Sequence, residues 1–220
     1  MKRNGRRTLI MGTMLLAAFA AWTALVCMAD VRSVGPMGTA VGFAGFNAWF
    51  HSLTGVHMSL YTVTDWLGLV PVAVCLAFCI VGIVQMIRHR GVTRVDRDIL
   101  LLGGYYILVI FCYIVFEMIP INFRPILIDG RLEASYPSST TLLVLCVMPT
   151  LTFLIGRRLK NGTAMKIIRV SVSLFSAAVV IGRLISGVHW FTDIFGGALL
   201  GGALFNLYKA AVLMNDERTR

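Results

Sequence analysis

The sequence predicts an all-α integral membrane protein with six transmembrane helices. Its residues are 58% hydrophobic with a mean hydropathy of +0.82, and only 14% of them are charged. A water-soluble domain of 220 residues cannot bury that much apolar surface. The apolar residues also fall into separate runs of about 20 residues, the length at which a helix crosses a bilayer.

The apolar runs follow one another along the whole chain, so we expect a single six-helix domain over residues 1–220. The predicted spans are residues 8–29, 66–87, 98–120, 138–156, 167–185 and 190–214. The first run resembles a signal peptide, but it is long for one, which favours an uncleaved anchor. Residues 41–50 are apolar but too short to cross, and they predict an interfacial or re-entrant helix.

Basic residues predict the orientation of these spans. By this topology, 16 of the 20 Lys and Arg fall on one side of the membrane. The positive-inside rule makes that side cytoplasmic, with both chain termini in the cytoplasm and the protein in the cytoplasmic membrane. The net charge of +10 is therefore a topology signal, and we exclude a nucleic-acid partner. The basic residues on the outer side are Arg32, Arg124, Arg131 and Arg183.

The five cysteines all lie in apolar runs and lack the spacing of a zinc site. We therefore expect reduced thiols in the protein core, with no metal and no other cofactor. The cysteines are Cys27, Cys75, Cys79, Cys112 and Cys146.

The stretch at residues 181–197 places Arg183, His189 and Asp193 in an apolar region. Ionisable groups at membrane depth are costly and indicate function by default. The four-residue spacing of His189 and Asp193 predicts that both lie on one helix face, where the carboxylate would orient the imidazole as a nucleophile or base. The alternative is that the pair only joins two helices.

A second polar cluster precedes the fourth span. Arg124 is followed by Pro125, and Ser138, Ser139 and Thr140 begin the span. Arginine suits phosphate binding, and a helix start rich in Ser donates to anions. A simple N-cap is the alternative for the serines. Because both clusters lie on the outer side, they predict an outward-facing phosphate site.

These residues, in this order, resemble the type 2 phosphatidic acid phosphatase superfamily. Its motifs are K-x6-R-P, P-S-G-H and S-R-x5-H-x3-D, and the third is nearly complete here with Gly182 in place of Ser. The resemblance covers roughly residues 117–202. It implies a six-helix bundle that hydrolyses phosphorylated membrane lipids without metal, through a phosphohistidine.

The resemblance also implies residue roles. His189 would attack phosphorus and Asp193 would orient it. The phosphoryl oxygens would be held by Arg124, Arg183, Ser138 and Ser139.

Two motif positions depart from the family. Glu117 stands where motif one has Lys, and Thr140 stands where motif two has the His that acts as general acid. Glu117 could pair with Arg124 or Arg131, weakening the phosphate site. A substitute acid could come from the outer side, where the candidates are His51, His57, Asp129 and Glu133. An easier leaving group is the other solution, and it favours polyprenyl diphosphates over phosphatidate-type lipids.

Two further alternatives stay open. A non-catalytic protein of the same fold could bind, sense or transport a lipid phosphate, which Glu117 and Thr140 favour. A small channel or transporter would use Arg183 and Asp193 as a buried pair. The glycines at 197 and 201 allow close helix packing within the chain, and they also leave open a homodimer.

Overall fold

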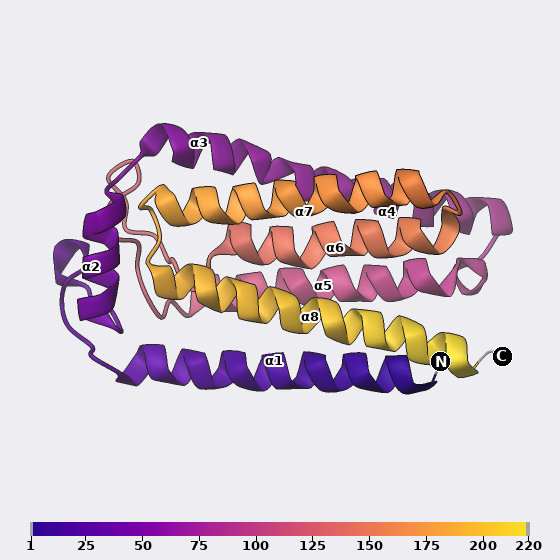
Figure 1. Ribbon diagram of the computed structural model, residues 1–220, viewed down its shortest axis with the longest axis horizontal. Coiled ribbons are helices and arrows are strands. Elements are labelled where there is room, and N and C mark those ends of the chain that lie inside the picture. Colours follow the sequence, from indigo (N-terminus) through magenta and orange to yellow (C-terminus); the bar gives the residue numbers. More distant parts are fainter. Residues whose placement is uncertain (1, 219–220) are drawn as a thin grey trace.

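The computed structural model describes residues 2–218, which form long helices packed side by side (Figure 1). The α-helices are α1 (Lys2–Met28), α2 (Ala44–Thr54), α3 (Met58–Leu67), α4 (Leu69–His89), α5 (Arg97–Met118), α6 (Ser139–Arg158), α7 (Gly162–Ile185) and α8 (Phe191–Arg218), with short 3-10 turns at Pro36–Gly38 and Val92–Arg94. Residues 2–218 contain isolated β-bridges but no strand. The all-α fold class is confirmed.

Six helices in this range are long and apolar enough to cross a membrane, as predicted. The candidate spans are Asn4–Met28, Met58–His89, Arg97–Met118, Ser139–Arg158, Gly162–Ile185 and Phe191–Glu217. The second span begins at Met58, whereas the sequence predicted residue 66. Polar side chains such as Thr62 and Asp65 hide this first part from a hydropathy reading. Gly68 then divides the span into α3 and α4.

The short helix α2 crosses one end of the bundle, while the start of α1 and the end of α8 lie at the other end (Figure 1). The prediction that the region of residues 41–50 forms a helix too short to span the membrane is therefore confirmed. The helix itself is displaced to Ala44–Thr54. It covers the end of the bundle at which α7 turns into α8.

The buried core lies between α1, α5, α6 and α8, while much of the apolar surface points outward, as a lipid environment favours. Buried members of this core include Phe19, Val26, Leu102, Tyr105, Leu142, Val147, Leu200, Leu204 and Val212. Outward-facing residues include Leu76, Ile107 and Leu174, which are 59%, 70% and 66% exposed. Cys27 and Cys79 are also exposed, so the expectation of core thiols was wrong for these two.

Glycines on α8 let this helix approach α6 closely. A Cβ added at Gly197 would lie 3.0 Å from the Ser138 carbonyl oxygen, and one at Gly201 would lie 2.9 Å from Leu145 Cβ. Small residues at such crossings allow backbone contact in membranes. The glycine pair therefore serves packing within the chain and holds α8 against the start of α6.

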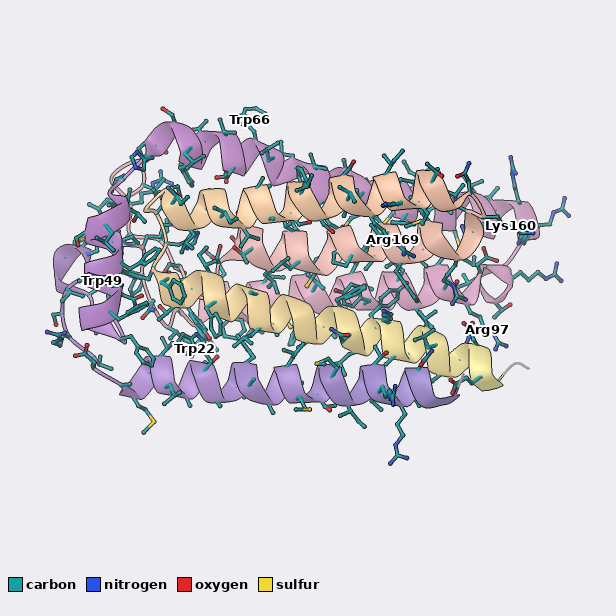
Figure 2. All side chains as sticks on the ribbon, in the orientation of Figure 1. Trp22, Trp49, Trp66, Arg97, Lys160 and Arg169 are labelled. Carbon is teal, nitrogen blue, oxygen red and sulfur yellow. The ribbon has the colours of Figure 1, made fainter. Side chains whose placement is uncertain are left out.

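Charged residues separate along the bundle. Figure 2 shows Arg97 and Lys160 at the end where the chain begins and ends, and Trp49, on α2, at the opposite end. At the basic end, Arg157 lies 2.9 Å from Asp98 and 2.7 Å from Asp216. These ion pairs join α5, α6 and α8 at the end of the bundle that lies away from α2.

We expect Gly201→Ala to destabilise the protein by about 1–3 kcal/mol, the usual cost of overpacking a core. The added methyl group would force Leu145 and α6 away from α8. The measurement is thermal unfolding of the purified protein in detergent.

Gly104→Ala in α5 is the matched control, because a Cβ there meets no atom of the described chain within 4 Å. Alanine also has the higher helix propensity. Equal unfolding temperatures for the two variants would contradict the packing argument.

Candidate active site

The turn between α7 and α8 is pressed into the bundle by the segment between α2 and α3. Gly187 has φ +70°, and a Cβ at this position would collide with the Gly55 carbonyl. The His57 N–H donates to the Ser186 carbonyl at 2.9 Å, and His51 Nε2 lies 3.0 Å from the Gly187 carbonyl oxygen. These contacts leave His189 only 3% exposed.

The arrangement of His189 and Asp193 differs from the one predicted. They do not share a helix face, because α8 begins at Phe191, after His189. Asp193 lies in the first turn of α8, where its Oδ2 accepts the Trp190 N–H at 2.9 Å and caps the helix. His189 Nδ1 lies 3.7 Å from the same oxygen, which is beyond hydrogen-bond distance. Asp193 therefore acts on the imidazole as a close negative charge.

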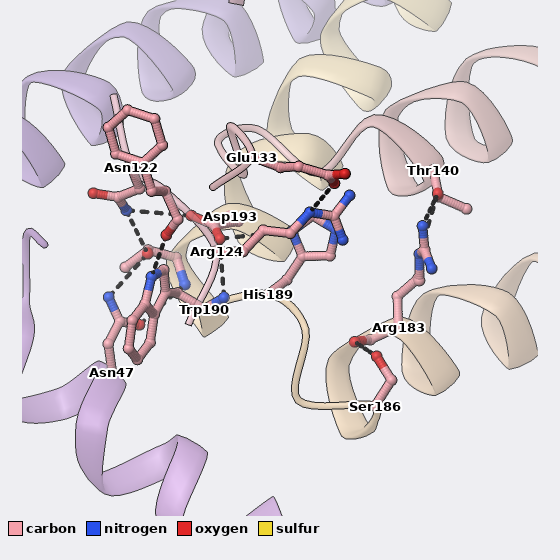
Figure 3. A network of polar contacts seen from close by, with 12 residues as sticks. Asn47, Asn122, Arg124, Glu133, Thr140, Arg183, Ser186, His189, Trp190 and Asp193 are labelled. Atoms are coloured by element: carbon pink, nitrogen blue, oxygen red, sulfur yellow. Dashed lines mark hydrogen bonds and ion pairs between the residues drawn. The ribbon is translucent and has the colours of Figure 1, made fainter. Parts of the chain in front are cut away.

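A buried amide network holds Asp193 from the side away from His189 (Figure 3). Asn122 Nδ2 donates to Asp193 Oδ1 at 3.2 Å. Asn47 on α2 donates to the Thr192 hydroxyl at 3.0 Å and to the Gly42 carbonyl at 2.8 Å. Sequence reasoning missed Asn47 and Asn122. Each is an uncharged amide in an apolar or loop stretch. Such a residue does not stand out in a sequence unless the residue that it contacts is known.

Arg183 projects from the last turn of α7 and is only 1% exposed. Its Nε and Nη2 donate to Thr140 Oγ1 at 3.1 and 2.7 Å, and Nη2 also lies 3.1 Å from Asp65 Oδ1. The guanidinium carbon stands 4.7 Å from the centre of the Tyr61 ring. Sequence reasoning placed neither Tyr61 nor Asp65 in the site, since α3 was expected to be a loop.

Gly182, which replaces the motif serine, allows this approach of α3. A Cβ at Gly182 would lie 2.6 Å from Cγ2 of Thr64, a buried residue. Thr64 stands between Tyr61 and Asp65 in the sequence of α3. The glycine therefore lets α3 lie directly on α7 and bring its polar residues to Arg183.

Arg124 comes from the loop before α6 and is 8% exposed. Its Nε lies 3.0 Å from Glu133 Oε2, an ion pair in which the N–H does not point at the oxygen. The guanidinium carbon is 5.7 Å from the centre of the Tyr61 ring, the same ring that meets Arg183. Tyr61 thus joins the two predicted phosphate-binding arginines through cation–π contacts.

Ser138 and Ser139 lie where the loop enters α6. The Ser138 N–H donates to the Asp193 carbonyl at 3.0 Å, which ties the two motifs together. Its hydroxyl is fully buried and does not cap α6, so the N-cap alternative is not supported. Ser139 is partly exposed and lines a cavity beside His189.

Several buried polar atoms at this end of the bundle have no hydrogen-bond partner within the described chain. They include both ring nitrogens of His189, the Ser138 hydroxyl and Nη1 of Arg124. Buried polar groups are normally hydrogen-bonded. Unpaired donors from three separate segments therefore indicate a site that takes an anionic ligand.

A cavity of about 10 Å³ lies against His189 and is also lined by Glu117, Tyr113 and Ser139. It has room for about one water molecule. A larger groove of about 320 Å³ lies between α3, α4, α5 and α6, and it shares Tyr113 and Ser139 with the cavity. The groove walls are mainly apolar, with Asp65 and Thr140 among the polar ones. The apolar groove therefore adjoins the polar cavity at His189.

Burial lowers the pKa of His189 from 6.5 to about 4. The Asp193 carboxylate opposes this shift, while the positive charges of Arg124 and Arg183 add to it. His189 is therefore an uncharged imidazole at neutral pH, the form that can attack an electrophile.

The expected partners of Glu117 were wrong. Among residues 2–218, Glu117 forms no ion pair with Arg124 or Arg131, and Arg124 pairs with Glu133 instead. Of the four candidate acids, none lines the cavity at His189. His51 and His57 contact backbone carbonyls, Glu133 pairs with Arg124, and Asp129 lies on an exposed turn. No group of three or more His, Cys, Asp and Glu in the described residues could hold a metal ion.

Comparison with known proteins supports the family resemblance that the motifs indicate. The sequence model of the PAP2 superfamily matches residues 104–217. The crystal structure of a transmembrane PAP2-type phosphatidylglycerolphosphate phosphatase from Bacillus subtilis matches with a TM-score of 0.66. The match covers 96% of this chain and 98% of that one, and at 18% identity it shows a shared fold. No curated protein matches the sequence. The predicted family resemblance is confirmed.

We expect His189 to stay uncharged down to about pH 4, because the folded chain shields its imidazole from water. The measurement is an NMR titration of histidine-labelled protein in detergent, with His189→Gln identifying the resonance.

The direction of the shift is the test. The pKa of His189 falls below that of a free imidazole only if the effect of burial outweighs the attraction of the Asp193 carboxylate. A titration midpoint at or above 6.5 would show that the carboxylate dominates, and would overturn this description of the site.

Proposed function

The chain belongs to the PAP2 superfamily, and on that premise we propose that it is a membrane lipid-phosphate phosphatase with His189 as its nucleophile. The observation that carries the proposal is the uncharged, buried imidazole with two unpaired nitrogens beside two arginines. A protein that only binds a phosphate needs no such group. The reaction proposed here uses no metal.

In the first step, Nε2 of His189 would attack phosphorus and the bond from phosphorus to the lipid oxygen would break. The imidazole gains a positive charge as it becomes phosphohistidine. Asp193 Oδ2, 3.7 Å from Nδ1, stabilises that charge. Asn122 and the Trp190 N–H keep the carboxylate in place for this role.

The phosphoryl oxygens would be bound by Arg124, Arg183, Ser138 and Ser139. Each arginine already faces a carboxylate, Glu133 or Asp65, whose side chains are 38% and 59% exposed. The arginine side chains are only 9% and 2% exposed, so a phosphate that displaces a carboxylate replaces one negative partner of a buried guanidinium with another and leaves no charge unpaired. Until then the carboxylates hold the arginines in position.

A membrane lipid is the proposed class of substrate. The groove of about 320 Å³ is walled by apolar residues of the spans and meets the His189 cavity at Tyr113 and Ser139. The cavity itself is too small for a phosphoryl group, so binding must move its walls apart. An acyl or prenyl chain in the groove would place its phosphate at the polar end.

We propose a preference for polyprenyl diphosphates over phosphatidate-type lipids. Thr140 occupies the position of the usual general acid, and its hydroxyl accepts two bonds from Arg183. The loss of a general acid matters least when the leaving group is a phosphate, since this needs less protonation than an alkoxide.

The proposed setting is the cytoplasmic membrane, with both termini inside and the site facing outward. Arg97 and Lys160 lie at the end of the bundle opposite Trp49 and α2, which supports this orientation (Figure 2). We also propose that residues 1–220 act as one unit, because α2 and α3 lie outside the matched range 104–217 yet contribute to the site.

Purified protein in detergent should release phosphate from undecaprenyl diphosphate faster than from phosphatidic acid. His189→Ala should lower the rate by at least ~10³-fold, because the nucleophile is lost. The measurement is initial phosphate release from each lipid under matched conditions.

His89→Ala, at the basic end of the bundle, is the control and should keep the wild-type rate. Faster hydrolysis of phosphatidic acid would contradict the proposed preference. Saturable lipid-phosphate binding without release from either lipid would favour the binding or transport protein instead.

The orientation predicts that a membrane-impermeant maleimide labels Asp129→Cys on intact cells, because this turn would face outward. Lys160→Cys should be labelled only after the membrane is permeabilised. Both variants are made in a background without the native cysteines.

Labelling of Lys160→Cys on intact cells, with Asp129→Cys protected, would reverse the proposed topology. The pair is matched because both side chains are exposed and lie at opposite ends of the bundle.

A further inference from the structure

Glu117 occupies a position that the family motif does not explain. It lies in the last turn of α5 and lines the same cavity of about 10 Å³ as His189. A carboxylate beside a phosphate site is unfavourable in binding, because like charges repel. Its placement therefore calls for a role in a step other than phosphate binding.

Three other carboxylates close to the predicted site residues are already engaged. Asp65 bonds to Arg183, Glu133 pairs with Arg124, and Asp193 accepts from Trp190 and Asn122. Within the described chain, Glu117 has neither a hydrogen bond nor an ion pair, and its side chain is exposed. It is thus the carboxylate at the His189 cavity that is available to accept a proton.

In this structure the cavity has room for a single water molecule. About 10 Å³ accommodates one water molecule, with Glu117 and His189 on its wall. Once the walls move apart to admit the phosphoryl group, a water that enters this space would lie between a phosphoryl group on His189 and the carboxylate of Glu117, which could deprotonate it. Thr140 cannot take the proton, since its hydroxyl is committed to Arg183 and is a weak base.

We propose that Glu117 is the general base for the second half of the reaction, the hydrolysis of phosphohistidine. This rests on the proposed function. The carboxylate takes one proton from water while the water oxygen bonds to phosphorus. The bond from phosphorus to the His189 nitrogen breaks, and its electron pair returns to the imidazole. Inorganic phosphate leaves, and Glu117 passes its proton to solvent.

This role separates the two half-reactions. The first needs no acid when the leaving group is a lipid phosphate, and the second needs a base, which the Glu117 carboxylate supplies. Replacement of the motif-one cation by Glu117 then compensates for the missing histidine at Thr140. The two departures from the family motif become one change in how protons are handled.

The test is a rapid-quench experiment with Glu117→Gln and undecaprenyl diphosphate labelled in its terminal phosphate. Glutamine keeps the shape of the side chain but cannot accept the proton. The expected result is a burst of about one equivalent of lipid product, an acid-labile phosphoprotein that accumulates, and steady-state release slowed by about 10²–10⁴-fold.

Asp129→Asn is the matched control, because this carboxylate lies on an exposed turn of the neighbouring loop and does not line the cavity. It should turn over as the wild type does, without accumulated phosphoprotein. Glu117→Ala with added formate is the second variant, in which the small carboxylate should restore phosphoprotein hydrolysis.

Each other outcome has a separate meaning. If Glu117→Gln turns over at the wild-type rate, only the role of Glu117 is overturned. The same holds if Glu117→Gln loses both the burst and the steady-state turnover. Wild-type protein that releases no phosphate and forms no phosphoprotein overturns the proposed function itself, and this inference with it.

Discussion

The burial of Arg183 in an apolar bundle is the constraint on which the site depends. A guanidinium that is 1% exposed must find acceptors inside the protein, and it finds them on two other helices, at Thr140 on α6 and Asp65 on α3. Satisfying one charge therefore holds three helices together at the end of the bundle that α2 crosses. Gly182 makes this arrangement possible by removing the side chain that would keep α3 away. The departure from the motif serine is in this sense a packing requirement of the neighbouring helix.

The start of α8 provides the second fixed point. Asp193 caps the helix through the Trp190 N–H, and the same carboxylate lies close to His189. One residue thus meets a structural need and an electrostatic one, because a negative charge at a helix start is favourable whether or not the imidazole is charged. Asn122 and Asn47 extend the support to the loop before α6 and to α2. The geometry around His189 is consequently held by backbone and amide groups whose charge does not change with pH.

Much of the fold was predictable, because membrane spans depend on local composition. Hydropathy identified six spans, and it failed only at the start of the second, where Asp65 and its polar neighbours resemble a loop. Asp65 is tolerated there because Arg183 faces it, and no local property of the sequence shows that contact. The expected ion pair of Glu117 with Arg124 failed for a related reason, since Glu133 reaches Arg124 from the other arm of the same loop. The helical pairing of His189 with Asp193 also failed, because the helix begins between them.

The sequence by itself determined the membrane class, the number of spans, the segregation of basic residues and the family, since each is readable from composition or from the spacing of a few residues. It also predicted that His189, Arg124 and Arg183 lie near one another, and they do. Only the tertiary structure decided which groups meet them. Tyr61, which touches both arginines, is 63 residues from one and 122 from the other, and Asn47 lies far before the motifs. Contacts at such separations depend on how helices pack, and helix packing depends on the shapes of many side chains together.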